Sequence, residues 1–84
     1  MYKIIWDTKS LRDLEALDNK IAIQIVKKVD SYLIQNPKNL GKVLSANYKG
    51  LYRYRDYRIV YEILDQEKTI RITKVGHRSK IYEE

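Results

Sequence analysis

Residues 50–63, GLYRYRDYRIVYEI, carry the clearest structural pattern in the chain. Tyrosines alternate with arginines up to Arg55, and after Asp56 tyrosines and isoleucines alternate with other residues. Side chains of a strand point alternately to opposite faces, so this pattern predicts a half-buried β-hairpin. One face of the hairpin is rich in tyrosine and is expected to be core. The other face is rich in arginine and is expected to be the surface that contacts a binding partner.

A two-residue turn at residues 55–56 gives the hairpin a self-consistent register. It places Tyr54 opposite Tyr57 and Arg53 opposite Arg58, and residues that lie directly opposite share a face. Two arginines side by side destabilise a sheet unless an anion or a carboxylate lies between them. A role in phosphate binding therefore explains the presence of two facing arginines better than a contribution to stability does. A basic face that is merely solvated is the alternative.

The composition predicts a small basic protein with one domain over residues 1–84. No apolar run is long enough for a membrane span, and the absence of cysteine excludes disulfides and fits a cytoplasmic setting. Seventeen Lys and Arg against 11 Asp and Glu give a formal charge of +6, which indicates an anionic partner. On composition alone, RNA binding and a solvated basic surface around a tyrosine-filled core are equally good interpretations.

Apolar spacing and capping residues predict the other elements of the fold. In chain order we expect a strand over residues 1–7, helices over 9–17 and 20–35, a loop over 37–49, the hairpin, and a strand over 68–75. Asp7 or Thr8 is expected to cap the first helix, and Asp18 or Asn19 the second. The order β-α-α-β-β-β predicts an α+β fold in which a small antiparallel sheet packs against two N-terminal helices.

A second group of polar residues lies in VGHRSKIY, residues 75–82, directly after the last expected strand. Its members are His77, Arg78, Lys80 and Tyr82. Histidine is suited to proton transfer near neutral pH, and arginine stabilises phosphoryl charge through paired hydrogen bonds. If this strand neighbours the hairpin, its end brings His77 and Arg78 toward the paired arginines. A lone surface histidine in a basic tail is the alternative.

The residue types also exclude several kinds of chemistry. One histidine, no cysteine and scattered carboxylates argue against a metal nuclease, and neither a phosphate-binding glycine loop nor a nucleophile elbow is present. What remains is metal-free cleavage of RNA, in which the 2′-OH attacks the adjacent phosphate. That reaction needs a proton acceptor, cations that stabilise the transition state, and a proton donor for the leaving oxygen. The chain is rich in cations but has no obvious base.

Over essentially its whole length, the chain resembles toxins of the RelE/ParE superfamily of toxin–antitoxin systems. The opening strand, the two helices ending near Asn36 and Pro37, the leucine-rich loop and above all GLYRYRDYRIVYEI and VGHRSKIY carry the resemblance. RelE-like members cleave mRNA in the ribosomal A site, whereas ParE-like members inhibit DNA gyrase. The joint presence of Arg58, Arg78 and Tyr82 resembles the RelE branch more closely.

The resemblance implies roles for individual residues, because RelE-like toxins surround the scissile phosphate with basic residues and stack a C-terminal aromatic residue on an mRNA base. The implied catalytic residues are Arg53, Arg58, His77, Arg78 and Tyr82. The expected RNA-binding residues are Lys49, Arg55, Arg71, Lys74 and Lys80. Relatives often have about two more residues in the hairpin turn, so the shorter turn here draws Arg55 into the turn itself. Some relatives have lysines at the first two hairpin arginines, which leaves His77 as the better group for proton transfer, with Tyr82 or Glu62 as weaker candidates.

The implied function is a ribosome-dependent mRNA endonuclease that a cognate RelB-like antitoxin holds inactive by covering its helices and basic face. Its partners would be the ribosome and mRNA, with no membrane, metal or small-molecule cofactor involved. Two alternatives stay open: a ParE-like inhibitor of DNA gyrase without catalysis, and a basic RNA-binding module whose catalysis is weak or lost.

Overall fold

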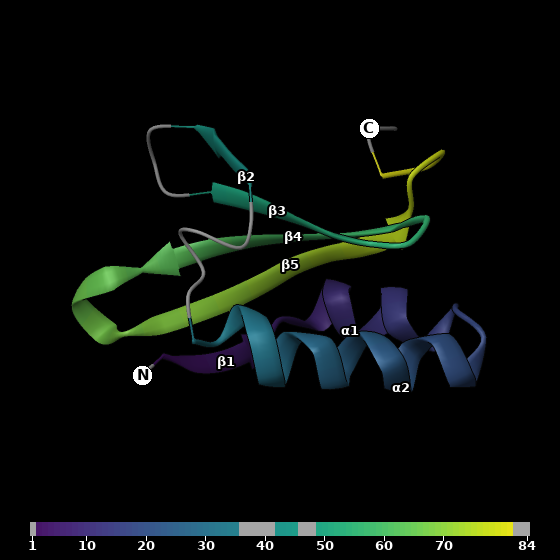
Figure 1. The fold of residues 1–84 in the computed structure, drawn as a ribbon, viewed down its shortest axis with the longest axis horizontal. Coiled ribbons are helices and arrows are strands. Elements are labelled where there is room, and N and C mark those ends of the chain that lie inside the picture. Colours follow the sequence, from purple (N-terminus) through teal and green to yellow (C-terminus); the bar gives the residue numbers. More distant parts are fainter. Residues whose placement is uncertain (1, 36–41, 46–48, 82–84) are drawn as a thin grey trace.

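The computed structural model describes residues 2–35, 42–45 and 49–81, which form a five-stranded sheet with two helices on one side (Figure 1). The elements in chain order are β1 (Lys3–Trp6), α1 (Thr8–Glu15), α2 (Asn19–Lys28), the π-helical turn η1 (Val29–Leu33), β2 (Lys42–Ser45), β3 (Lys49–Tyr54), β4 (Tyr57–Leu64), the 3-10 turn η2 (Asp65–Glu67) and β5 (Thr69–His77). The α+β class and the order of the predicted elements are confirmed. Strand β2 is an addition, because it lies where a loop was predicted.

The sheet has the strand order β1-β5-β4-β3-β2. Neighbouring strands from β2 to β5 are antiparallel, whereas β1 runs parallel to β5. The sheet is therefore mixed: the predicted antiparallel pairing holds from β2 to β5, and the prediction was wrong for β1. Alternation within a strand fixes which residues share a face, but it carries no information on the direction of the neighbouring strand.

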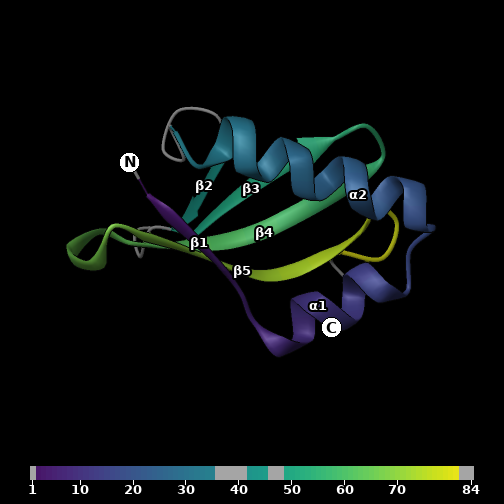
Figure 2. The same ribbon diagram turned by 90° about the horizontal axis from the view of Figure 1, so that it is seen from below.

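The helices begin where aspartates cap them, as the sequence predicted. The Asp7 carboxylate accepts a hydrogen bond from the Ser10 N–H at 2.8 Å, and the Asp18 carboxylate accepts one from the Lys20 N–H at 3.2 Å. Helix α2 continues into η1, where the backbone N–H of Ile34 donates to the carbonyl of residue 29 at 3.1 Å. Both helices lie on the same face of the sheet. Figure 2 shows α1 nearer to β5 and α2 nearer to β3 and β4.

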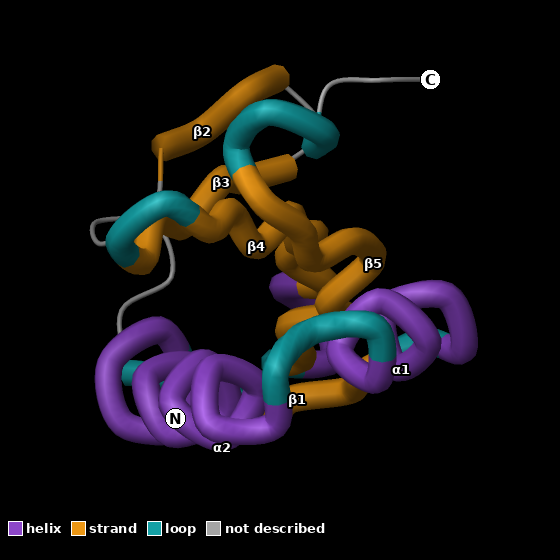
Figure 3. Tube along the Cα trace, turned by 90° about the vertical axis from the view of Figure 1, so that its right-hand side faces the viewer, coloured by secondary structure: helices purple, strands orange, loops and turns teal. Residues whose placement is uncertain are grey.

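The end-on view in Figure 3 shows the helices and the sheet as two layers, and the core lies between them. Its buried members are Leu14, Ile25, Val29, Ile59, Tyr61, Ile63, Ile70, Ile72 and Val75. The Tyr61 ring lies against the backbone of Gly50, where a Cβ atom would be only 2.3 Å from the Tyr61 Cζ atom. A side chain at residue 50 would therefore have to displace the buried Tyr61 ring. Burial of the Tyr61 hydroxyl raises its pKa to about 12.

A β-bulge keeps the second half of β5 in register with this core. The register shifts by one residue between Val60 and Tyr61 of β4, and the extra residue on β5 is Thr73. The Thr73 hydroxyl donates to the Val60 carbonyl at 3.3 Å. The bulge lets Val75 point into the core, and it places Lys74 on the arginine-rich face. Strand β5 runs two residues beyond its predicted end and includes His77.

None of the helices in the described part of the chain combines the length and apolar character that a bilayer-spanning helix requires.

Candidate nucleic-acid interface

The arginine-rich face of the hairpin has the register that the sequence predicted. Tyr54 lies opposite Tyr57, Arg53 lies opposite Arg58, and a two-residue turn joins β3 to β4. We call Arg53 and Arg58 the arginine pair. Arg53 is exposed and Arg58 is half-buried. Among the described residues, neither member of the pair forms an ion pair with a carboxylate.

Backbone carbonyls hold the Arg58 guanidinium in place. Its Nη1 atom donates to the carbonyl of Arg55 at 2.9 Å and to the carbonyl of Tyr57 at 2.8 Å. These bonds occupy one end of the guanidinium and fix its orientation beside the turn. Because arginine has five N–H donors, the others can still bind an oxyanion. A fixed guanidinium beside a second positive charge is a suitable site for a phosphate group.

The C-terminal end of β5 brings Arg78 to the same end of the hairpin. The backbone N–H of Arg78 donates to the carbonyl of Asp56 at 2.7 Å. The Arg78 Nε atom also lies 3.7 Å from the Asp56 Oδ1 atom, with both side chains largely exposed. An exposed ion pair of this length contributes little stability, so Asp56 leaves Arg78 available for a competing phosphate.

Arg55 occupies the first position of the turn with a φ angle of 55°. This left-handed conformation is unfavourable for a residue with a Cβ atom. The Arg55 guanidinium lies over the ring of Tyr54, 5.5 Å from its centroid. Its RNA-binding role was expected from the sequence, but the short turn directs the side chain to Tyr54.

His77 lies beside the hairpin but on the opposite face from the arginine pair. It is the partner of Tyr57 across β4 and β5, and their rings meet edge to face at 5.7 Å. The residue opposite Arg58 is Gly76. Adjacent strands thus bring His77 close to the pair along the chain, but alternation turns its side chain toward the helix side.

Two contacts from Ser79 define the hydrogen-bonding state of the His77 ring. The Ser79 backbone N–H donates to Nδ1 at 3.1 Å, and the Ser79 Oγ atom lies 2.8 Å from the same nitrogen. Since Nδ1 accepts the backbone hydrogen bond, the proton of the neutral ring lies on Nε2. Within the described residues, Nε2 has no hydrogen-bond partner. His77 therefore presents a donor, whereas a general base requires an acceptor.

The other basic residues expected to bind RNA divide into two groups. Lys80 is exposed in the turn after β5, near Arg78. Arg71 forms an ion pair with Glu62, and Lys49 is the partner of Glu62 across β3 and β4. Glu62, the partner of Arg71, lies four positions from Arg58 along β4, which corresponds to about 13 Å along a strand. Arg71 and Lys49 thus lie apart from the arginine pair, and Glu62 is committed to Arg71. Tyr82, expected to stack on a base, lies outside the described residues.

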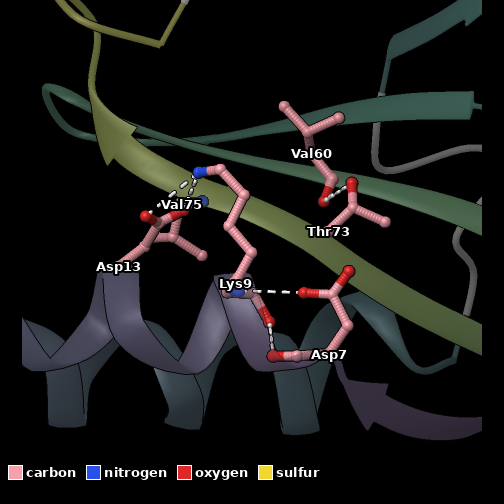
Figure 4. Close-up of polar contacts among 7 residues, drawn as sticks. Asp7, Lys9, Asp13, Val60, Thr73 and Val75 are labelled. Carbon is pink, nitrogen blue, oxygen red and sulfur yellow. Dashed lines mark hydrogen bonds and ion pairs between the residues drawn. The ribbon is translucent and has the colours of Figure 1, made fainter.

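A cleft that the sequence did not reveal lies beside the end of β5, along the edge that does not pair with β4. Strand β1 pairs with β5 only as far as Ile72, and α1 lies alongside the rest of the strand. There the Asp13 carboxylate accepts a hydrogen bond from the Val75 N–H at 2.9 Å and pairs with Lys9 at 3.2 Å (Figure 4). The cleft has a volume of about 760 Å³. Its polar lining comes from Lys9, Asp13, Tyr57, Lys74, His77, Ser79 and Lys80. His77, Ser79 and Lys80 come from the VGHRSKIY segment, but only the tertiary packing of α1 against β5 brings Lys9 and Asp13 beside them, so no local motif could have identified the cleft.

The arrangement is suited to binding a phosphodiester and to stabilising negative charge that develops on it. Arg53, Arg58 and Arg78 lie at one end of the sheet, where a phosphate can meet more than one guanidinium. Guanidinium groups stay protonated at any physiological pH, so they cannot remove a proton from a 2′-OH.

Comparisons with known proteins agree with this architecture. Residues 4–82 match the family model described as ParE toxin of type II toxin–antitoxin system, parDE. The chain is 37% identical over 83 residues to the protein named Toxin RelE of Mycobacterium tuberculosis, covering 96% of this chain and 86% of that protein. It is 32% identical over 83 residues to Toxin RelG of the same organism, covering 96% and 95%.

Solved structures of related proteins share the fold. The RelBE2 toxin–antitoxin complex of Mycobacterium tuberculosis contains a chain with a TM-score of 0.84 and 30% identity, covering 92% of this chain and 98% of that one. The isolated RelE toxin of Escherichia coli gives a TM-score of 0.79 at 23% identity, covering 98% and 92%. At that identity the likeness is one of fold alone. The chain therefore belongs to the RelE/ParE family of toxins of type II toxin–antitoxin systems, and it is RelE-like.

Proposed function

We propose that this toxin is a ribosome-dependent endoribonuclease that cleaves mRNA in the ribosomal A site and so stops translation in the cytoplasm. The observation that carries the proposal is the convergence of three arginines at one end of the sheet. Arg53 and Arg58 lie opposite each other, and the Arg78 backbone is bonded to the hairpin turn at 2.7 Å. Sequence similarity to proteins named RelE and RelG supports the same branch of the family.

In the proposed reaction, the 2′-OH of the substrate attacks the adjacent phosphorus atom. The bond from O2′ to phosphorus forms and the bond from phosphorus to O5′ breaks, leaving a 2′,3′-cyclic phosphate and a 5′-OH. Water accepts the 2′-OH proton as the nucleophile attacks, and water supplies a proton to O5′ as it departs. The arginines stabilise the additional negative charge on the non-bridging oxygens in the transition state.

Proton transfer is the step to which this chain contributes least. Glu62 is paired with Arg71, and the His77 side chain lies on the face opposite the arginine pair. We therefore propose that charge stabilisation by the arginines, together with alignment of the mRNA on the ribosome, accounts for most of the acceleration. This division of labour would make cleavage dependent on the ribosome.

We also propose that a RelB-like antitoxin holds the toxin inactive by covering its helices and basic face. Relatives of this fold were solved as complexes of toxin and antitoxin in Mycobacterium tuberculosis and Escherichia coli. Two exposed apolar side chains on the helices, Leu11 and Ile23, offer anchors for such a partner.

The test is to induce the toxin in cells and to map mRNA 5′ ends relative to the reading frame. We expect cuts at a fixed position within codons, and an Arg58→Ala plus Arg78→Ala variant is expected to cut at least about a hundredfold less. A Lys20→Ala plus Lys27→Ala variant is the matched control, because it removes two exposed charges from α2 instead. Intact mRNA in growing cells would contradict the proposal.

Inhibition of DNA gyrase, the activity of ParE-like toxins, is the second candidate. It is favoured by the family model that matches residues 4–82, which is described as a ParE toxin. The same induced cells distinguish the two functions. Growth arrest with DNA breaks and intact mRNA would establish the gyrase inhibitor, and RNA binding without either effect would indicate a module that lacks catalysis.

A further inference from the structure

The cleft between α1 and the end of β5 belongs to neither the arginine pair nor the core. It lies at the edge of β5, where strand β1 has ended and the Asp13 carboxylate meets the Val75 N–H at 2.9 Å. Its volume of about 760 Å³ falls within the range of about 300–1,000 Å³ that is usual for small-ligand sites. The cleft is therefore large enough to receive one nucleotide unit.

The lining of the cleft combines positive charge with one oriented donor. Three lysines (Lys9, Lys74 and Lys80) and one carboxylate, that of Asp13, line it, so cations exceed anions. Lys9 comes from α1 and Lys80 from the turn after β5, which places ammonium groups on two sides. His77 is held by Ser79 at Nδ1 and by the edge of the Tyr57 ring. Its Nε2–H is thereby presented to a hydrogen-bond acceptor, such as a base oxygen or ring nitrogen.

The cleft also adjoins the arginine pair across a single strand. Gly76 lines the cleft and is the residue opposite Arg58 in the sheet. Neighbouring strands lie about 4.8 Å apart, so a single-stranded chain that crosses the end of β5 can reach both sites. The Ile81 side chain packs over this end, with its Cδ1 atom 3.6 Å from the position of a Cβ at Gly76, and it is 3% exposed. The turn that carries Lys80 is thus fixed beside the cleft.

We propose that this cleft binds the nucleotide of single-stranded RNA next to the scissile phosphate, with His77 contacting the base and Lys80 contacting its phosphate. The inference rests on the proposed function and adds a specificity site to it. His77 becomes a base-contacting residue on this account, and the cleavage chemistry is left to the arginines. Base preference beside the cut then depends on the side chain at residue 77.

The binding test uses the full chain and a 2′-O-methyl RNA trinucleotide, which cannot be cleaved because its 2′ oxygens are blocked. His77 is the only histidine in the sequence, so its ring signals in NMR spectra need no further assignment. We expect the trinucleotide to shift the His77 ring signals, and inorganic phosphate, which has no base, to shift the arginine side-chain signals and leave the His77 ring signals in place. A Lys80→Gln variant is expected to raise the Kd for the trinucleotide by about 3- to 10-fold.

Lys27→Gln is the matched control, because it removes one exposed charge from α2 and should leave this Kd unchanged. Unmoved His77 signals at trinucleotide concentrations that saturate the arginine signals would overturn the inference. So would a Lys80→Gln variant that binds as tightly as the wild type. Both variants lie at exposed positions, and circular dichroism checks that they fold.

Cleavage maps separate failure of this inference from failure of the proposed function. If the wild type cuts mRNA, a His77→Gln variant should keep at least about a third of the cutting and change the distribution of bases beside the cut. Loss of all cutting would instead place His77 in the chemistry and overturn the inference. If the wild type cuts no mRNA, the proposed function fails, while the NMR titration still decides whether the cleft binds RNA.

Discussion

The two faces of strand β4 have different roles, although their residues alternate along a single strand. On the helix side, Ile59 and Tyr61 are fully buried in the core. On the other side, Arg58 lies opposite Arg53 with no carboxylate between them among the described residues. The first face stabilises the fold, whereas the second holds like charges together, which favours an anion and disfavours the empty state. Substitutions on the two faces should therefore affect different properties.

The largest expected difference in stability is between neighbours on β4. An Ile59→Ala variant should lower the free energy of unfolding by about 2–5 kcal/mol, because it leaves a cavity in the core. Arg58→Ala should cost less than about 1.5 kcal/mol, since it loses two hydrogen bonds to carbonyls at the turn, one exposed and one part-buried. Urea unfolding followed by circular dichroism measures both. Equal losses from the two substitutions would break the distinction between the faces.

Both faces of the hairpin were predictable because their signal is local. Alternation in residues 50–63 fixes the faces, and the short turn then fixes the register of Arg53 against Arg58. The aspartate caps were predictable for the same reason, since each contact spans two or three residues. The parallel direction of β1 and the pairing of β2 depend on long-range packing that no local pattern encodes.

The arrangement of the site was only partly predictable. The arrival of Arg78 at the hairpin followed from strand order, and the structure supports it with the bond to Asp56. The orientation of His77 did not follow, because it depends on the register of β5 against β4 and on the bulge at Thr73. The cleft required α1 to pack beside β5, a contact in which Asp13 and Val75 are 62 positions apart.

A smaller effect concerns the buried hydroxyl of Tyr61 and depends on pH. Burial raises its pKa from 10.0 to about 12 in the folded chain, so the protonated form is favoured by folding. Its contribution to the free energy of unfolding is fully present below pH 10 and is lost as the pH rises through about 12. The loss amounts to about 2–3 kcal/mol. Unfolding between pH 9 and 12 measures this loss of stability.

Tyr61→Phe should make the decline of the free energy of unfolding with pH less steep, with Tyr57→Phe as a control for removing a hydroxyl from the same face. A decline as steep in Tyr61→Phe as in the wild type would exclude this residue as the cause.

The smallest expected effect tests the like charges of the arginine pair directly. Arg53→Ala should stabilise the chain in dilute chloride by about 0.2–1 kcal/mol, because it removes the charge that opposes Arg58. Phosphate should narrow this difference, since an anion bound to the pair stabilises the wild type by about 0.8 kcal/mol at roughly three times its Kd. Thermal unfolding in phosphate and in chloride of equal ionic strength separates specific binding from screening.

Lys49→Ala is the matched control for this measurement, because Lys49 is exposed on the same strand but neighbours Glu62 instead of an arginine. Its response to phosphate should equal that of the wild type, whereas Arg53→Ala should respond no more to phosphate than to chloride. If Arg53→Ala keeps the full response, the anion binds elsewhere, and Arg58 with Arg78 would be the next pair to test. If it loses the response while Lys49→Ala retains it, the hairpin face that is least favourable for folding is the one that binds phosphate.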